Sequence, residues 1–205
     1  MRTYYNRIAG HSVERLAALS DGIFAVAMTL LVLDLHGPAK EAIHSEQDLW
    51  RGLASMSPQL IAYLMSFLTL GIFWNGQQAQ LNHLARGDRS LAWIHIAFLF
   101  AVSIMPFSTR LLAEFITYRT ALLVYWSNIL LLGSALCGGW KYAMRAGLVY
   151  EEAGPEVSRA IERRIVIAQA LYALGAALCV INPYVSIAFI VLLQVGFAFG
   201  WISRF

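Results

Sequence analysis

Long apolar blocks separated by short polar segments dominate the chain. Residues 54–85, 90–109, 120–140 and 165–203 contain no Asp, Glu, Lys or Arg. A helix needs about 20 mostly apolar residues to cross a bilayer. The last block is about twice that length and is interrupted by Asn182-Pro183, which predicts two helices joined by a tight turn. Together with the apolar run after Arg15, the pattern predicts six spans, at residues 14–35, 56–78, 90–112, 119–145, 159–181 and 184–203.

Helix is the expected form of all six spans. Backbone N–H and C=O groups in lipid have no water to bond to, so a spanning segment must satisfy them internally. The alternation of apolar and polar residues that marks a membrane β-strand is absent from these blocks. We therefore predict an all-α integral membrane protein with one six-helix domain over residues 1–205.

The composition supports a membrane protein. Of the 205 residues, 59% are hydrophobic and 13% are charged, and the mean hydropathy is +0.61. Soluble domains carry roughly 25% charged residues, so this chain lacks the charge to cover a soluble surface. The pI of about 9.0 reflects basic residues in the predicted loops, and without a long basic run we expect no nucleic-acid partner. Cys137 and Cys179 both fall inside predicted spans, where packing explains them better than a disulfide or a metal site.

The distribution of Lys and Arg predicts the orientation. With the N-terminus inside, eleven basic residues, among them Arg2, Arg7 and Arg204, fall on the cytoplasmic side and four fall outside. Cytoplasmic segments of membrane proteins carry the excess of Lys and Arg, so we place both termini in the cytoplasm. The longest outside loop, residues 36–55, is polar and predicts a short surface helix.

Polar residues stand near the start of the first span. A charged group in hydrocarbon costs at least a few kcal/mol. Arg15 is close enough to the helix end for its side chain to reach the headgroups, whereas Asp21 lies six residues, or about 9 Å, deeper. Asp21 therefore needs a partner on another helix or subunit. The simpler alternative is that Ser20 and Asp21 cap the first helix.

Between Asp21 and Asp34 the first span is apolar apart from Thr29. Val26, Leu30 and Leu33 recur at i, i+4 and i+7, so they share one helix face. Such a stripe is by itself typical of lipid contact or core packing.

The second span ends in a polar cluster that contains Trp74, Asn75, Gln77 and Gln78. Trp and amide side chains are ordinary anchors at a membrane interface, and at this depth they could also contact Asp21. The sequence has no carbonyl-filter motif, no HExxH, no Gly-rich phosphate loop and no Ser, His and Asp at a common depth. We therefore expect no enzymatic activity, no metal site and no cofactor.

Three stretches resemble the potassium channels of the transmembrane protein 175 family. They are RLAALSDGIFAVAMTLLVLDL, which resembles the family's first-helix signature, GIFWNGQQ, and AFLFAVSIMPFSTRLLAEF. The resemblance covers residues 12–125 well and the last two helices only by hydropathy. It implies a homotetrameric, K⁺-permeable cation channel in a prokaryotic plasma membrane, with K⁺ as the permeating ion and the first helix of each subunit lining the pore.

The resemblance also assigns roles to individual residues. It implies that Arg15, Ser20 and Asp21 form a polar network between helices, for which Trp74, Asn75 and Gln77 are the candidate partners. It places the apolar constriction at Val26, with Leu30 and Leu33 one and two turns further, and a hydroxyl layer at Thr29. An apolar ring of this kind gates by expelling water.

Two features depart from the family pattern, and two other functions stay open. Leu19 replaces the signature Phe, and Gln77 and Gln78 stand where the family often has histidines. Val26 is also smaller than the residue common at the constriction. The alternatives are a cation/proton secondary transporter that uses Asp21 and a membrane scaffold that transports nothing.

Overall fold

The computed structural model describes residues 12–152 and 154–200, and their regular structure is helical apart from one isolated backbone bridge between Leu84 and Val149. Arg2, Arg7 and Arg204, which contributed to the predicted orientation, lie outside the described residues. The α-helices are α2 (Val13–Leu33), α3 (Glu46–Ser55), α4 (Ser57–Leu81), α5 (Arg89–Glu114), α6 (Arg119–Ala146), α7 (Pro155–Ala177) and α8 (Pro183–Ala198), with short 3₁₀ turns η1 (Lys40–Ala42) and η2 (Leu178–Val180).

Polar caps and turn residues set the ends of these helices. The side chains of Ser12, Ser45, Asp88 and Asn182 each accept a hydrogen bond from a backbone N–H in the first turn of the helix that follows. Gly147 ends α6 in the left-handed conformation, with φ of 64°, which glycine adopts without a Cβ penalty.

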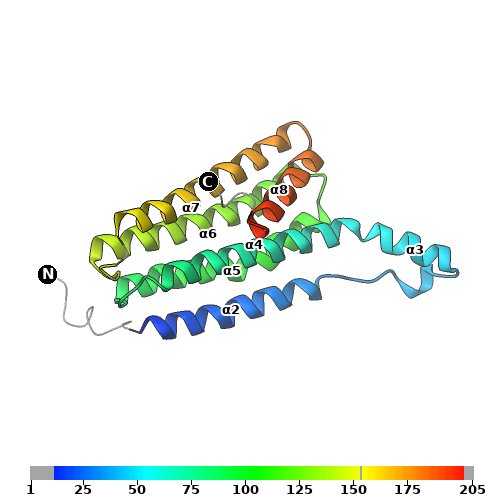
Figure 1. Cartoon of the computed structure of the whole chain (residues 1–205). Coiled ribbons are helices and arrows are strands. Elements are labelled where there is room, and N and C mark those ends of the chain that lie inside the picture. The colour runs from blue at the N-terminus through cyan, green and yellow to red at the C-terminus, as the bar shows by residue number, and fades with distance from the viewer. Residues whose placement is uncertain (1–11, 153, 201–205) are drawn as a thin grey trace.

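The predicted spans correspond to six long helices. Five of them, α2, α4, α5, α6 and α7, are long and apolar enough to cross a membrane, and α8 is a shorter apolar helix. The fold is therefore the predicted all-α membrane bundle of about six spanning helices. The predicted surface helix in the outer loop is α3, which extends beyond the end of the bundle (Figure 1).

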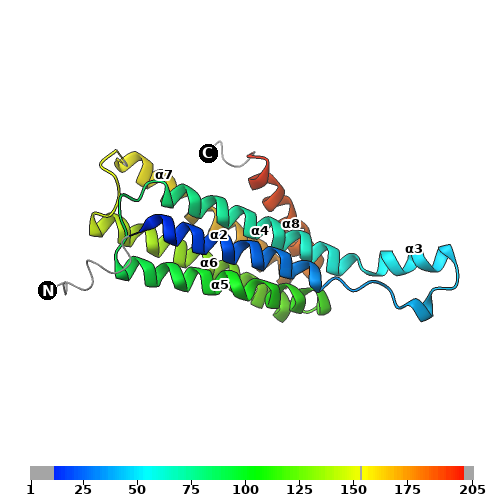
Figure 2. The same ribbon diagram turned by 90° about the horizontal axis from the view of Figure 1, so that it is seen from below.

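The helices pack so that α2 lies on one side of the bundle. It contacts α4 and α5, while α6 joins α5 to α7, and α8 packs against α4 and α7. Figures 1 and 2 show α2 running along α4 and α5 and separated from α7 by the other helices. Because α2 has neighbours on one side only, a large part of its surface is open in a single chain.

Candidate functional site

The N-terminus of α2 contradicts the hypothesis that Ser20 and Asp21 cap the first helix. The helix starts at Val13, and the side chain of Ser12 accepts a hydrogen bond from the backbone N–H of Arg15. Ser20 and Asp21 lie two turns inside the helix. The prediction that they cap the first span was therefore wrong, because a better cap precedes them.

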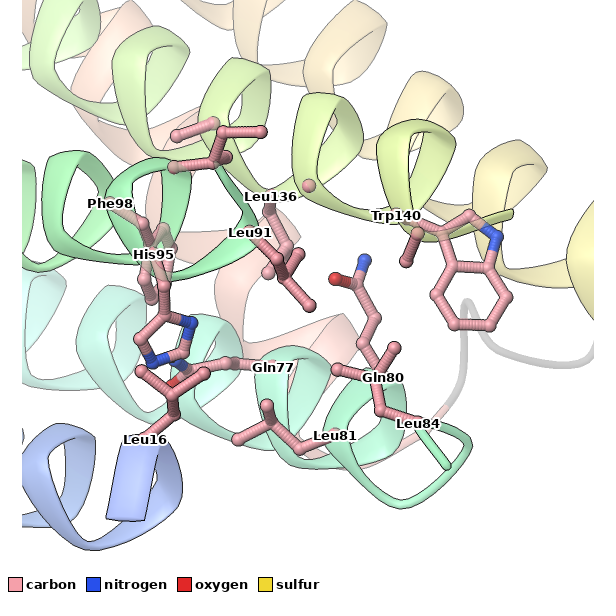
Figure 3. A pocket seen from close by; sticks show the side chains of 14 residues that line it. Leu16, Gln77, Gln80, Leu81, Leu84, Leu91, His95, Phe98, Leu136 and Trp140 are labelled. Atoms are coloured by element: carbon pink, nitrogen blue, oxygen red, sulfur yellow. The ribbon is translucent and has the colours of Figure 1, made fainter. Parts of the chain in front are cut away.

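Ser20 belongs to a buried polar cluster that joins three helices. Its Oγ lies 2.6 Å from Nε2 of His95 on α5 and accepts a 2.9 Å hydrogen bond from Nε2 of Gln77 on α4. The same hydroxyl lies 2.8 Å from the carbonyl oxygen of Leu16, to which it donates. The amide of Gln77 and the ring of His95 are also 3.0 Å apart (Figure 3). All three polar side chains are buried, so each needs these partners to offset its lost hydration.

A cavity of about 30 Å³ lies next to this cluster. Figure 3 shows Gln77 and His95 at one end of it, and Gln80 and Trp140 at the other. A space of this size has room for one or two water molecules. The cluster is therefore closely packed, and the cavity is too small for a hydrated ion to pass.

Asp21 forms a second, more exposed cluster. Its Oδ1 accepts hydrogen bonds from Nε1 of Trp74, at 2.8 Å, and from Nε2 of Gln78, at 2.9 Å. Both donors lie on α4 and belong to the polar run predicted as a candidate set of partners. Asp21 is nevertheless exposed in a single chain, so its carboxylate is only partly enclosed by its own subunit.

Two of the residues assigned to the network stand apart from it within one chain. The guanidinium of Arg15 is exposed and forms no ion pair or hydrogen bond with any residue that the structure describes. Asn75 is exposed, and its side chain likewise has no hydrogen bond within the described ranges. The polar network inside one subunit consequently contains Ser20 and Asp21 in two separate clusters.

The apolar stripe of α2 lies on its open surface. Val26, Leu30 and Leu33 are 56%, 43% and 68% exposed, whereas Phe24 and Leu31 are buried against the bundle. Thr29 is also exposed, and its Oγ1 lies within hydrogen-bond distance of the carbonyl oxygens of Ala25 and Val26, at 3.0 and 2.9 Å. Its proton is thus directed to the backbone of its own helix, and the lone pairs of its oxygen stay accessible.

An apolar groove of about 630 Å³ runs between α2 and α5. Val26 and Leu30 line it from α2, and Leu99, Phe100 and Ser103 line it from α5. Gly22 also borders the groove, and a Cβ placed there would meet nothing within 4 Å. The groove is therefore wide enough to accept side chains from outside the subunit.

Comparisons of the sequence and the structure with known proteins assign the chain to a family. The family model "Endosomal/lysosomal potassium channel TMEM175" matches residues 15–106. A potassium channel of Streptomyces collinus is 32% identical, with the alignment covering 84% of this chain and 82% of that protein. The chain belongs to the TMEM175 family.

Further relatives extend the match beyond the first three spans. A potassium channel of Chamaesiphon minutus is 30% identical over 90% of this chain and 92% of its own length. The crystal structure of a lysosomal potassium-selective channel TMEM175 homolog from Chamaesiphon minutus matches with a TM-score of 0.80 at 28% identity, covering 91% of this chain and 96% of that one. The last two helices, which resembled the TMEM175 family only by hydropathy, are thus part of the same fold.

Sequence reasoning missed two members of the polar clusters of this TMEM175 protein. His95 was not among the predicted network partners, although it completes the contact between Ser20 and Gln77. Gln78 lay in the polar run that could contact Asp21, but it was not named among the candidate network partners, and it does donate to Asp21. The signal for both was their similar distance from the end of the bundle where α2 and α5 begin and α4 ends, which brings polar groups of neighbouring helices to one depth.

Proposed function

We propose that four copies of this chain form a K⁺-permeable channel in a prokaryotic plasma membrane, which prefers K⁺ over Na⁺ and passes other monovalent cations less well. Two relatives named as potassium channels align over more than four fifths of this chain and of their own length. In this proposal the chain is no enzyme, both termini are cytoplasmic, and its partners are other copies of the chain, membrane lipid, K⁺ and other monovalent cations.

Our assignment of α2 as the pore-lining helix rests on the exposure of Asp21. Asp21 lies on the open surface of α2, eight residues after the helix starts. A carboxylate facing hydrocarbon is costly, so ionisable groups in spans face other protein or a water-filled space. If the open surface of α2 faced lipid, this carboxylate would face lipid too. Covering it with neighbouring subunits around a central axis avoids that cost.

The groove between α2 and α5 is where we place the neighbouring subunit. It is apolar, its volume is about 630 Å³, and it borders the stripe that would face the axis. Membrane helices associate by close van der Waals packing at small residues, and Gly22 supplies such a position. A second copy of the chain is the occupant that would bury the groove and bring four α2 helices together.

Gating and selectivity follow from the residues on the open face of α2. Rings of Val26, Leu30 and Leu33 would expel water from a narrow pore and so oppose the passage of a hydrated ion. The accessible lone pairs of Thr29 would form a layer of acceptors that replaces part of the hydration shell. Ser20 and Asp21 take no part in ion contact in this scheme. They hold α2 against α4 and α5 so that the rings align.

Reconstitution into liposomes tests the proposal. Wild-type protein should give K⁺ flux above background and above Na⁺ flux. Replacing Leu30 by Asn should wet the constriction and raise K⁺ flux by about tenfold, which corresponds to about 1.4 kcal/mol of barrier. Leu131→Asn is the matched control, because Leu131 is 46% exposed on α6 against 43% for Leu30. Background flux or a lack of K⁺ preference would refute the channel, and equal effects of the two substitutions would refute α2 as its lining.

A further inference from the structure

A second cavity, distant from α2, lies between α4 and α7. Its volume is about 210 Å³, and its walls are mainly apolar, with Ile72, Phe73 and Gly76 from α4 and Ile165 and Ala168 from α7. Its lining on α7 extends from Ala160 to Tyr172, or about 18 Å along the helix axis. The space is therefore long enough for a substantial part of a hydrocarbon chain, and it lies between two spanning helices.

Residues that line this cavity also carry buried polar atoms without partners, and one of them, Gln80, borders the cavity of about 30 Å³ as well. Nε2 of Gln80 and Oη of Tyr172 are buried and have no hydrogen-bond partner among the described residues. The side chains of Gln80 and Tyr172 are only 7% and 1% exposed. Oε1 of Gln169, on the same wall, is buried without a partner as well. An unsatisfied buried polar atom costs about 1–3 kcal/mol, so a ligand or water in this cavity that supplies a partner would be stabilising.

One cation borders the cavity. Arg164 is exposed and forms no ion pair or hydrogen bond with any residue in ranges 12–152 and 154–200. It is the last charged residue before the uncharged part of α7, which begins at Ile165. That position corresponds to the headgroup level on the side where α4 ends and α7 begins. A donor amide at Gln80 and a guanidinium at Arg164 thus flank the same space from two helices.

We propose that this cavity binds an anionic phospholipid of the leaflet at that end of the bundle, with its phosphate on Arg164 and part of one acyl chain between α4 and α7. Basic pockets between spanning helices bind acidic headgroups, and guanidinium groups hold phosphate oxygens by charge-assisted hydrogen bonds. Nε2 of Gln80 donates to an oxygen of the headgroup region. Gln169 and Tyr172, at the deeper end, are bridged by water. Lipid binding at this site does not depend on ion conduction, so this proposal can fail while the proposed channel function holds, and the reverse.

Lipid retention tests the proposal on the full chain. Protein reconstituted into vesicles of phosphatidylglycerol and phosphatidylcholine is extracted in mild detergent, and each lipid bound per chain is measured by native mass spectrometry. Wild-type protein should retain phosphatidylglycerol in preference. Arg164→Gln should lower that retention roughly fivefold, the factor that one basic group near an anionic surface contributes. Arg163→Gln is the matched control, because Arg163 is the adjacent exposed arginine and does not border the cavity.

Filling the cavity tests the acyl chain separately from the headgroup. A Cβ on Gly76 would approach nothing closer than Cδ2 of Leu136, at 3.6 Å, so Gly76→Leu can extend into the cavity. It should lower retention of phosphatidylglycerol although Arg164 is intact. Ala168→Leu serves as a second filling variant, and elution volume on gel filtration verifies that each variant assembles. No preferential retention by the wild type, an equal loss in Arg163→Gln and Arg164→Gln, or unchanged retention in the assembled filled variants would each overturn the proposal.

Discussion

Replacing Asp21 by Asn tests whether this carboxylate only holds helices together or carries protons during transport. Oδ1 of Asp21 accepts two hydrogen bonds, from Trp74 at 2.8 Å and from Gln78 at 2.9 Å. Asparagine is nearly isosteric and keeps this acceptor oxygen, but it removes the negative charge. Hydrogen bonds to charged groups contribute about 1.5–3 kcal/mol and neutral ones about 0.5–1.5 kcal/mol. Two weakened bonds at an exposed position should therefore lower the free energy of unfolding by about 1–2 kcal/mol.

The measurement combines stability with flux. Unfolding of the purified protein in mixed micelles with SDS should show the loss of stability. K⁺ flux into liposomes should fall by less than about tenfold, since nothing at the proposed constriction changes. Flux is recorded with and without an imposed pH gradient. Glu41→Gln, which removes an exposed carboxylate on η1, should change neither quantity.

One result would refute this reasoning. If a pH gradient drives K⁺ uptake by the wild type, and Asp21→Asn abolishes the coupling without loss of stability, the carboxylate carries protons. The chain would then be an exchanger, and the exposed stripe of α2 would need another explanation. K⁺ flux that ignores the pH gradient in both proteins would instead support the channel.

Two further predictions concern packing. Ser20→Ala and Gln77→Leu are combined in a double-mutant cycle of unfolding in SDS. The coupling free energy should be about 0.6–1.7 kcal/mol, from the average to the maximum for interhelical hydrogen bonds in membranes. The reason is that the two side chains share a hydrogen bond and have His95 as a common neighbour. A coupling near zero would mean that the cluster does not hold the helices together. Gly175→Ala should lower stability by about 1–3 kcal/mol, because its Cβ would come within 2.8 Å of a neighbouring side chain on α8, whereas Gly138→Ala, in open space, should leave the midpoint of the same titration unchanged or higher.

The positions of the helices could largely be predicted from the sequence, because apolar length is the dominant constraint on a spanning segment. The sixth predicted span was placed to end at residue 203, whereas α8 ends at Ala198. The fifth predicted span was placed to start at residue 159, whereas α7 begins at Pro155. The charges of its first turns resemble a loop when only hydropathy is considered. The start signal was nevertheless present, since Gly154 precedes a proline in the first helical turn.

The polar clusters could be predicted only in part. That Asp21 needs a partner follows from the cost of a charge in a membrane, and Trp74 was among the candidates. Which amide serves which residue could not be derived, since Gln77 and Gln78 are adjacent in sequence but face different neighbours. On a helix, adjacent residues differ by about 100°, so Gln77 faces the buried Ser20 while Gln78 reaches the exposed Asp21.

The uneven attachment of α2 has a mechanical consequence. Among the described residues, its side-chain hydrogen bonds to other helices lie at Ser20 and Asp21. Towards its far end, α2 is held by the non-directional packing of Leu31 and by the exposed contact between Asp34 and Arg110, at 4.0 Å, which contributes little. If α2 tilts about the hydrogen bonds near its N-terminal end, the tilt displaces each residue in proportion to its distance from those bonds. Val26 is about 8 Å from Asp21 along the helix and Leu33 about 18 Å. The same tilt would therefore move Leu33 more than twice as far as Val26. The proposed pore would then change its width more at Leu33 than at Val26.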